Sequence, residues 1–132
     1  MAGKWNSHHF KNDYPITLEL ACGGGEYTVG LAQMYPDRNF IGVDIKGARL
    51  WRGAKTCLLS GLDNAAFIRA RIEGIAQFFA VGEVAEIWIT FPDPFLREGK
   101  ALKRLTSIRF MNEYRKLLQK GGLVPALRLF HP

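Results

Sequence analysis

The chain has 132 residues, 48% of them hydrophobic and 23% charged, and a formal net charge of +6 at pH 7. This length fits one domain, and the apolar share is enough to bury a single core. No apolar run reaches the roughly 18 residues of a membrane span, and the polar start MAGKWNSHHFKNDYP excludes a signal-peptide core. We therefore expect one soluble, cytoplasmic domain over 1–132, without a membrane partner.

The cysteines and histidines predict no disulfide and no metal site. Cys22 and Cys57 have neither CxxC spacing nor the density of a secreted disulfide scaffold, which favours a reducing compartment and two thiols that pack as small apolar groups. His8 and His9 are adjacent, so they point apart in an extended chain and lack further ligands at metal spacing.

The first predicted elements are two buried strands with a helix between them. The apolar runs ITLELA at 16–21 and NFIGVD at 39–44 are typical of strands covered on both faces. Between them, apolar residues recur at helical spacing: Tyr27, Leu31 and Met34. The pattern predicts strand, helix, strand.

A second helix follows over KGARLWRGAKTCLLSG and ends at Gly61. Its predicted buried face consists of five residues: Leu50, Trp51, Ala54, Cys57 and Leu58. AAFIRA at 65–70 predicts a third strand, and GIAQFFA at 74–80 a short helix. We expect Trp88, like Trp51, to pack in the core or between helix and sheet, whereas Trp5 suits either a core or base stacking.

The last predicted elements are a strand at 84–91, rich in β-branched and aromatic residues, and an amphipathic helix that ends at Gly121. The apolar face of that helix carries Phe110, Met111, Tyr114, Leu117 and Leu118. Alternating strands and helices predict an α/β fold with a mostly parallel sheet and helices on both faces.

The positive charge is concentrated in one segment. Between Arg97 and Lys120 there are eight Lys or Arg and two acids, so this stretch carries the whole net charge of +6. Such clustering suits a polyanionic partner, and the simpler alternative is a solvated helix face.

In a parallel sheet of this kind, ligands bind beyond the carboxyl ends of the strands. After the first strand come Gly23, Gly24 and Gly25, which permit close approach of a ligand to the backbone. Asp44 ends the second strand, where a ribose-binding acid belongs, whereas no acid follows the third strand before Glu73. After the fourth strand, Asp93 lies between two prolines in FPDP.

These positions favour a nucleoside ligand that carries an amino acid. Asp44 would accept from ribose hydroxyls, and Glu19, four residues before the first glycine, could accept from an ammonium group. A nicotinamide-cofactor fingerprint would place a third glycine where this chain has Thr28. A nucleotide-cofactor oxidoreductase is therefore the less favoured alternative.

Three stretches resemble one family. LELACGGGEYTVGLAQMYPDRNFIGVDIKGARLWRGA, EIWITFPDP and KRLTSIRFMNEYRKLLQKGG are similar to the bacterial tRNA (guanine-N7)-methyltransferases over about residues 14 to 123. The resemblance implies a Rossmann-like class I methyltransferase fold, S-adenosylmethionine as the cofactor, and methylation of guanine N7 in the tRNA variable loop.

The resemblance also implies roles for individual residues. Glu19, Gly23 and Gly25 match the family's cofactor motif E-x-G-x-G-x-G, whose first glycine is Ala21 here, and Asp44 with Ile45 matches the acid after strand two. Arg71 and Ile72 stand where many members place an Asp-Ala pair at the adenine. Asp93 matches the acid implied to lie at the guanine and to take part in catalysis, and four basic residues are implied in tRNA binding: Arg97, Lys100, Lys103 and Arg104.

The resemblance ends after KGG. The tail at 122–132 reads GLVPALRLFHP, with Pro125 in what should be a central strand. We expect a truncated or frame-shifted product that lacks C-terminal sheet strands, with an exposed strand edge that favours a homodimer. An alternative function is a tRNA-binding or cofactor-binding remnant without turnover.

The implied chemistry needs little proton transfer. Guanine N7 carries a lone pair that can attack a sulfonium methyl group directly. Catalysis would then depend mainly on holding the nitrogen, methyl and sulfur in line. Asp93 would accept from the guanine N1 and N2 edge, although an acid in such a turn can also simply cap local amides.

Overall fold

The computed structural model describes residues 1–20, 25–44, 47–90, 108–118 and 127–130. Its centre is a five-stranded parallel sheet with the strand order β3-β2-β1-β4-β5. The strands are β1 (Ile16–Leu20), β2 (Asn39–Asp44), β3 (Ala65–Arg69), β4 (Glu86–Thr90) and β5 (Leu127–Phe130). The helices are η1 (Trp5–Phe10), α1 (Glu26–Met34), α2 (Gly47–Ser60), η2 (Ile72–Phe78) and α4 (Ile108–Leu117).

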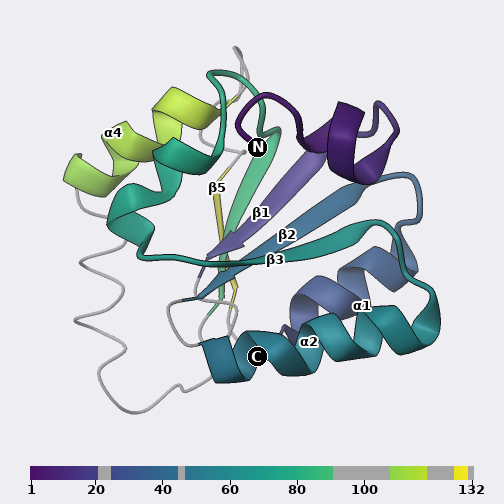
Figure 1. Ribbon diagram of the computed structural model, residues 1–132. Helices are drawn as coiled ribbons and strands as arrows, with labels where there is room; N and C mark the ends of the chain where they lie inside the picture. Colours follow the sequence, from purple (N-terminus) through teal and green to yellow (C-terminus); the bar gives the residue numbers. More distant parts are fainter. Residues whose placement is uncertain (21–24, 45–46, 91–107, 119–126, 131–132) are drawn as a thin grey trace.

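Helical elements cover both faces of the sheet, as the sequence predicts. α1 and α2 follow β1 and β2 and pack on one face, and η1, η2 and α4 lie on the other (Figure 1). Right-handed crossovers between neighbouring parallel strands put consecutive helices on the same face. α1 joins β1 to β2 and α2 joins β2 to β3, so these two helices share a face.

β1 and β2 match their predicted ranges closely because continuous apolar runs leave little choice of structure. Every residue of both strands is buried. β1 lies at the centre of the sheet, paired with β2 and with β4. β5 lies in the tail, two residues beyond Pro125, so the strand begins after the proline.

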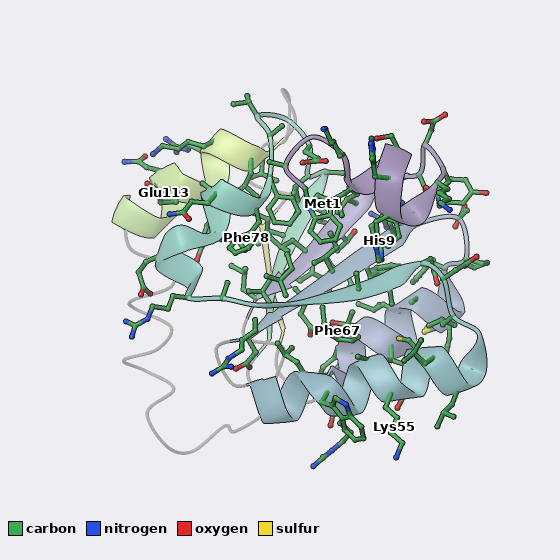
Figure 2. All side chains as sticks on the ribbon, in the orientation of Figure 1. Met1, His9, Lys55, Phe67, Phe78 and Glu113 are labelled. Atoms are coloured by element: carbon green, nitrogen blue, oxygen red, sulfur yellow. The ribbon has the colours of Figure 1, made fainter. Side chains whose placement is uncertain are left out.

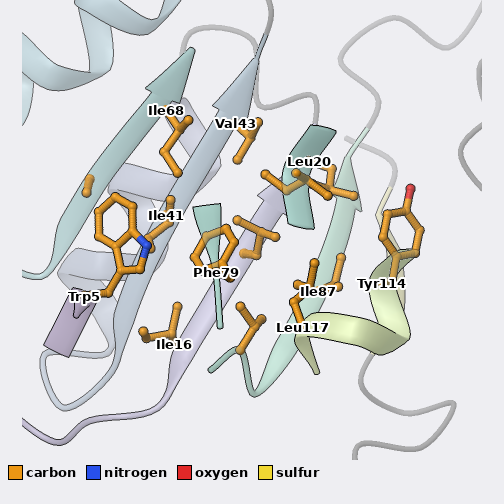
Figure 3. Packing of buried hydrophobic residues seen from close by; sticks show 14 of the residues in the cluster. Trp5, Ile16, Leu20, Ile41, Val43, Ile68, Phe79, Ile87, Tyr114 and Leu117 are labelled. Atoms are coloured by element: carbon orange, nitrogen blue, oxygen red, sulfur yellow. The ribbon is translucent and has the colours of Figure 1, made fainter. Parts of the chain in front are cut away.

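The larger core lies under η1, η2 and α4 (Figure 3). Alternate residues of the central strands point into it, among them Ile41 of β2 and Ile87 of β4. Phe79, Tyr114 and Leu117 cover these side chains from the helical layer. Burial raises the pKa of the Tyr114 phenol, and the negative charge of Glu73 raises that pKa further.

The N-terminal segment is part of this core. Trp5 is only 7% exposed, and its indole Nε1 donates to the carbonyl oxygen of Phe78 at 2.8 Å. The Glu83 carboxylate accepts from the backbone N–H groups of Gly3 (2.8 Å), Trp5 (3.2 Å) and Ala80 (2.9 Å). Of the two roles that the sequence left open for Trp5, the structure supports core packing.

The predicted apolar faces of α1 and α2 are wrong in part. Trp51 is 64% exposed and Leu58 is 83% exposed, and the α2 residues that face the sheet are smaller: Leu50, Gly53, Ala54 and Cys57. In α1, Met34 is also exposed, and the buried residues are Thr28, Val29 and Ala32. Small residues let both helices approach the sheet closely, which a search for large apolar residues does not detect. Trp88, by contrast, is partly buried.

Candidate functional site

Glu19 of β1 is a buried carboxylate on the face covered by α1. Its side chain is 3% exposed, and the hydroxyl of Thr28 in α1 donates to it. Leu18 and Leu20 belong to the opposite core, so strand alternation turns Glu19 toward α1. A buried carboxylate is retained only where partners or a ligand compensate for its lost hydration.

Asp44 ends β2 on the same face of the sheet as Glu19. In the register, Glu19 lies beside Gly42, and Asp44 is two residues farther toward the carboxyl end. Gly42 has no side chain, so it places no atoms beyond its backbone between the two acids. Asp44 is buried and lies beside Arg69 of β3. The sheet therefore brings both predicted acids to the carboxyl end of neighbouring strands on one face.

Gly25 caps the start of α1 where a side chain has no room. Its φ is +81°, a conformation that side-chain-bearing residues rarely adopt. A Cβ atom at this position would lie 2.6 Å from Cε1 of Phe67 and 3.5 Å from the Cα atom of Gly53 in α2. The tight glycine turn that the sequence predicts is thus present at its last glycine, with the first amides of α1 beyond it.

Arg71 and Ile72 lie just past the end of β3. Arg71 is exposed and precedes η2, whose first residue is Ile72, and its carbonyl oxygen accepts from the N–H of Gly74 at 3.0 Å. Both residues therefore follow a strand whose carboxyl end borders that of β2. Their predicted contact with an adenine stays a prediction.

Several predicted site residues lie outside the described part of the chain. These are Gly23, Ile45, Asp93 and the basic residues Arg97, Lys100, Lys103 and Arg104. The described end of the basic segment is in α4, where Arg115 and Lys116 are exposed. Lys116 forms an ion pair with Glu113 at 2.9 Å, so part of the positive charge is balanced locally.

Two neighbours of the site were not predicted as such. In the sequence, Thr28 is only a departure from a nicotinamide-cofactor fingerprint, yet its hydroxyl donates a hydrogen bond to Glu19. Phe67 fills the space under the glycine turn. A hydroxyl nine residues after a strand glutamate, on the buried side of the following helix, is the signal that could have identified Thr28.

The arrangement suits a ligand with hydroxyl or ammonium donors. Glu19 and Asp44 offer carboxylate oxygens, and α1 begins with a turn that permits close approach. In the described ranges no group of three or more His, Cys, Asp or Glu could hold a metal ion. No helix among the described residues is long and apolar enough to cross a membrane.

The sequence matches known proteins over most of its length. Residues 13–127 match a family model described as "Putative methyltransferase". A tRNA (guanine-N(7)-)-methyltransferase from Christiangramia forsetii is 57% identical over 124 residues, which cover 94% of this chain and 55% of the relative. A tRNA (guanine-N(7)-)-methyltransferase from Bacteroides fragilis is 60% identical over 124 residues, which cover 48% of that relative. The chain spans about half the length of these relatives.

Solved structures give the same fold. An antibiotic-related methyltransferase superposes with a TM-score of 0.72 at 18% sequence identity, over 91% of this chain and 60% of that one. A SAM-dependent methyltransferase from Aquifex aeolicus gives a TM-score of 0.62 at 16% identity, over 80% and 51%. Such identities support the Rossmann-like class I methyltransferase fold and nothing finer. The family match over residues 13–127 shows that this chain belongs to the family described as "Putative methyltransferase".

Proposed function

We propose that this chain binds S-adenosylmethionine and belongs to an enzyme that methylates N7 of a guanine in the tRNA variable loop. The observation that carries the proposal is the pair of buried acids, Glu19 and Asp44, on one sheet face beside the glycine turn. The relatives named as tRNA guanine-N7 methyltransferases, at 54–60% identity, support the substrate.

The described residues fit this cofactor. Asp44 would accept from the ribose hydroxyls, since it ends β2 at the carboxyl edge of the sheet. Glu19 would accept from the ammonium group, and Thr28 fixes the carboxylate that does so. Gly25 permits the left-handed turn with which α1 begins, because its backbone conformation and the nearby Phe67 ring exclude a side chain there.

The chemistry asks the protein for position more than for proton transfer. Bound S-adenosylmethionine supplies an electrophilic methyl group, and guanine N7 has a lone pair in the major groove. Asp93 is proposed to accept from the guanine N1 and N2 edge. Arg97, Lys100, Lys103 and Arg104 are proposed to contact tRNA phosphates, which would make tRNA affinity depend on salt.

The first experiment is calorimetry of S-adenosylmethionine binding to the chain and to two variants, Glu19→Gln and Asp44→Asn. Each variant keeps the side-chain volume and removes a charge, so we expect an affinity loss of about tenfold to a hundredfold. The matched control is Asp37→Asn, because Asp37 is an exposed acid before β2. Equal binding by all four proteins would contradict the cofactor site.

A second experiment follows transfer of a labelled methyl group to a tRNA transcript and maps the modified base. We expect N7-methylguanine in the variable loop, and its loss in Asp93→Ala with cofactor binding retained. Cofactor or tRNA binding without transfer would point instead to the remnant without turnover.

Three finer assignments belong to the same proposal. The enzyme would act in the cytoplasm, where tRNA is modified, and would need no metal ion, since N7 methylation requires no deprotonation. It would also form a homodimer.

A further inference from the structure

An apolar groove runs along the outer edge of β3. Its volume is about 920 Å³, and all five residues of β3 line it. Met1, His9 and Phe78 form its wall on one face of the sheet, while α2 forms the other wall (Figure 2). Phe67 points toward α2 from the floor. β3 is the outermost described strand on this side.

The backbone of β3 presents hydrogen-bonding groups to this groove. The N–H of Phe40 donates to the carbonyl of Asn64, and the N–H of Ala70 donates to the carbonyl of Asp44. The backbone N–H and C=O groups of the even-numbered residues therefore face β2. Because these groups alternate along a strand, those of Ala65 and Phe67 face the groove. An edge strand of this kind is a template for another strand.

The wall formed by α2 places one large apolar side chain at the groove. Leu58 lines the groove and is 83% exposed. Elsewhere the exposed side of α2 is mixed, with Leu59 and Trp51 beside Arg52 and Lys55. α2 contacts both β2 and β3, so its axis lies inward from the sheet edge. A second helix placed symmetrically beyond the edge would then have room at the usual interaxial separation of about 8–10 Å.

Two copies of β3 carry complementary charges when they pair antiparallel. Asp63, which precedes β3, and Arg69, its last residue, are both exposed, line the groove, and lie three residues either side of Ala66. Antiparallel pairing of two β3 strands about Ala66 would put Asp63 of each copy opposite Arg69 of the other. The same register puts Ala65 opposite Phe67, small against large, and Ala66 opposite its own copy.

We propose that β3 forms a two-fold antiparallel pair with β3 of a second copy of this chain, centred on Ala66. The pair joins two sheets into one and brings the two α2 helices together over their exposed leucines. Such an interface is isologous and closed, so it produces a dimer and not a filament. It would be independent of cofactor and tRNA, so its failure would count against the proposed homodimer and leave the proposed methyl transfer untouched.

Sedimentation velocity across a wide concentration range, without cofactor or RNA, tests the interface. We expect concentration-dependent dimers, and at least about tenfold weaker association in Leu58→Asp and in Asp63→Lys. The matched controls are Val81→Asp, at a residue 86% exposed and outside the groove lining, and Asp37→Lys. A chain that stays monomeric, or dimers that survive both groove variants, would overturn the proposal.

Cross-linking tests the register. Directly opposite residues in a non-hydrogen-bonded antiparallel pair have Cα atoms about 4.5 Å apart, within disulfide range. We expect Ala66→Cys to give a dimer band that reductant removes, and the unmodified chain, with Cys22 and Cys57, to give none. Val81→Cys controls for random encounters. Dimers that Ala66→Cys fails to cross-link would refute pairing about Ala66.

Discussion

The two faces of the sheet bury different kinds of side chain. The face under η1, η2 and α4 carries large apolar groups, including Trp5, Phe79 and Tyr114. The face under α1 and α2 carries glycines and carboxylates at its carboxyl edge, with a smaller apolar cluster beside them. The first face supplies most of the hydrophobic stabilisation, and the second accepts buried charge that a ligand can use.

The largest expected effect is on the apolar face. Trp5→Ala removes a buried indole and its hydrogen bond to Phe78, and we expect the free energy of unfolding to fall by about 3–5 kcal/mol. Trp51→Ala is the matched control, because the same change at an exposed site should alter stability by no more than about 0.5 kcal/mol. Denaturation by urea measures both, and similar losses would erase the distinction between core and surface tryptophans.

The next largest effect is on the face with the carboxylates. Gly25→Ala forces a side chain into a left-handed conformation and against Phe67, so we expect a loss of at least about 2 kcal/mol. Gly30, inside α1, has nothing within 4 Å of an added Cβ. Gly30→Ala should therefore stabilise the chain by about 0.5–1 kcal/mol. If thermal unfolding shows the two variants shifting alike, the close contact at Gly25 is not real.

A smaller effect should reach the cofactor through Thr28. Thr28→Val keeps the shape but removes the donor to Glu19, so we expect a loss of about 1–2 kcal/mol in stability. We also expect the affinity for S-adenosylmethionine to fall about tenfold. Thr28→Ser keeps the hydroxyl and should retain that affinity. Calorimetry compares them, and unchanged affinity in Thr28→Val would limit Thr28 to packing.

The smallest effect is a dependence of stability on alkaline pH. The pKa of Tyr114 is raised in the folded chain, so folding favours the protonated phenol. Its contribution is fully present below the unfolded pKa of about 10, and above that pH stability falls by about 1.4 kcal/mol per pH unit. Tyr114→Phe cannot ionise and should lose less stability between pH 10 and 11 than the native chain. If urea titrations show the free energy of unfolding falling equally with pH in the native chain and in Tyr114→Phe, the raised pKa of Tyr114 is contradicted.

The sequence predicted the sheet well and the helix faces less well. Continuous apolar runs at β1 and β2 specify buried strands within a residue or so, and strand alternation then puts Glu19 and Asp44 on one face. In α2, large apolar residues lie on two sides of the helix, and periodicity alone does not decide which side meets the sheet. The small side chains of Gly53 and Ala54 decide it by allowing close approach.

Contacts between distant parts of the chain explain the rest of the differences. Nothing near Trp5 in the sequence indicates that it will pack beside Phe79, because those partners come more than seventy residues later. The bond from Thr28 to Glu19 likewise depends on how α1 sits on β1. Composition and local periodicity do not record such contacts.

The anchoring of the N-terminal segment also sets an order of events during synthesis. Gly3 binds the Glu83 carboxylate eighty positions later, and Trp5 binds the same group. At about 5–20 residues per second, the ribosome needs roughly 4–16 s to make that stretch. Throughout this interval Trp5 has no native partner from Phe78 to Glu83, so the nascent chain exposes an indole that chaperones can recognise. Gly3 and Trp5 can therefore reach their native partners only after the segment at 78–83 has been made.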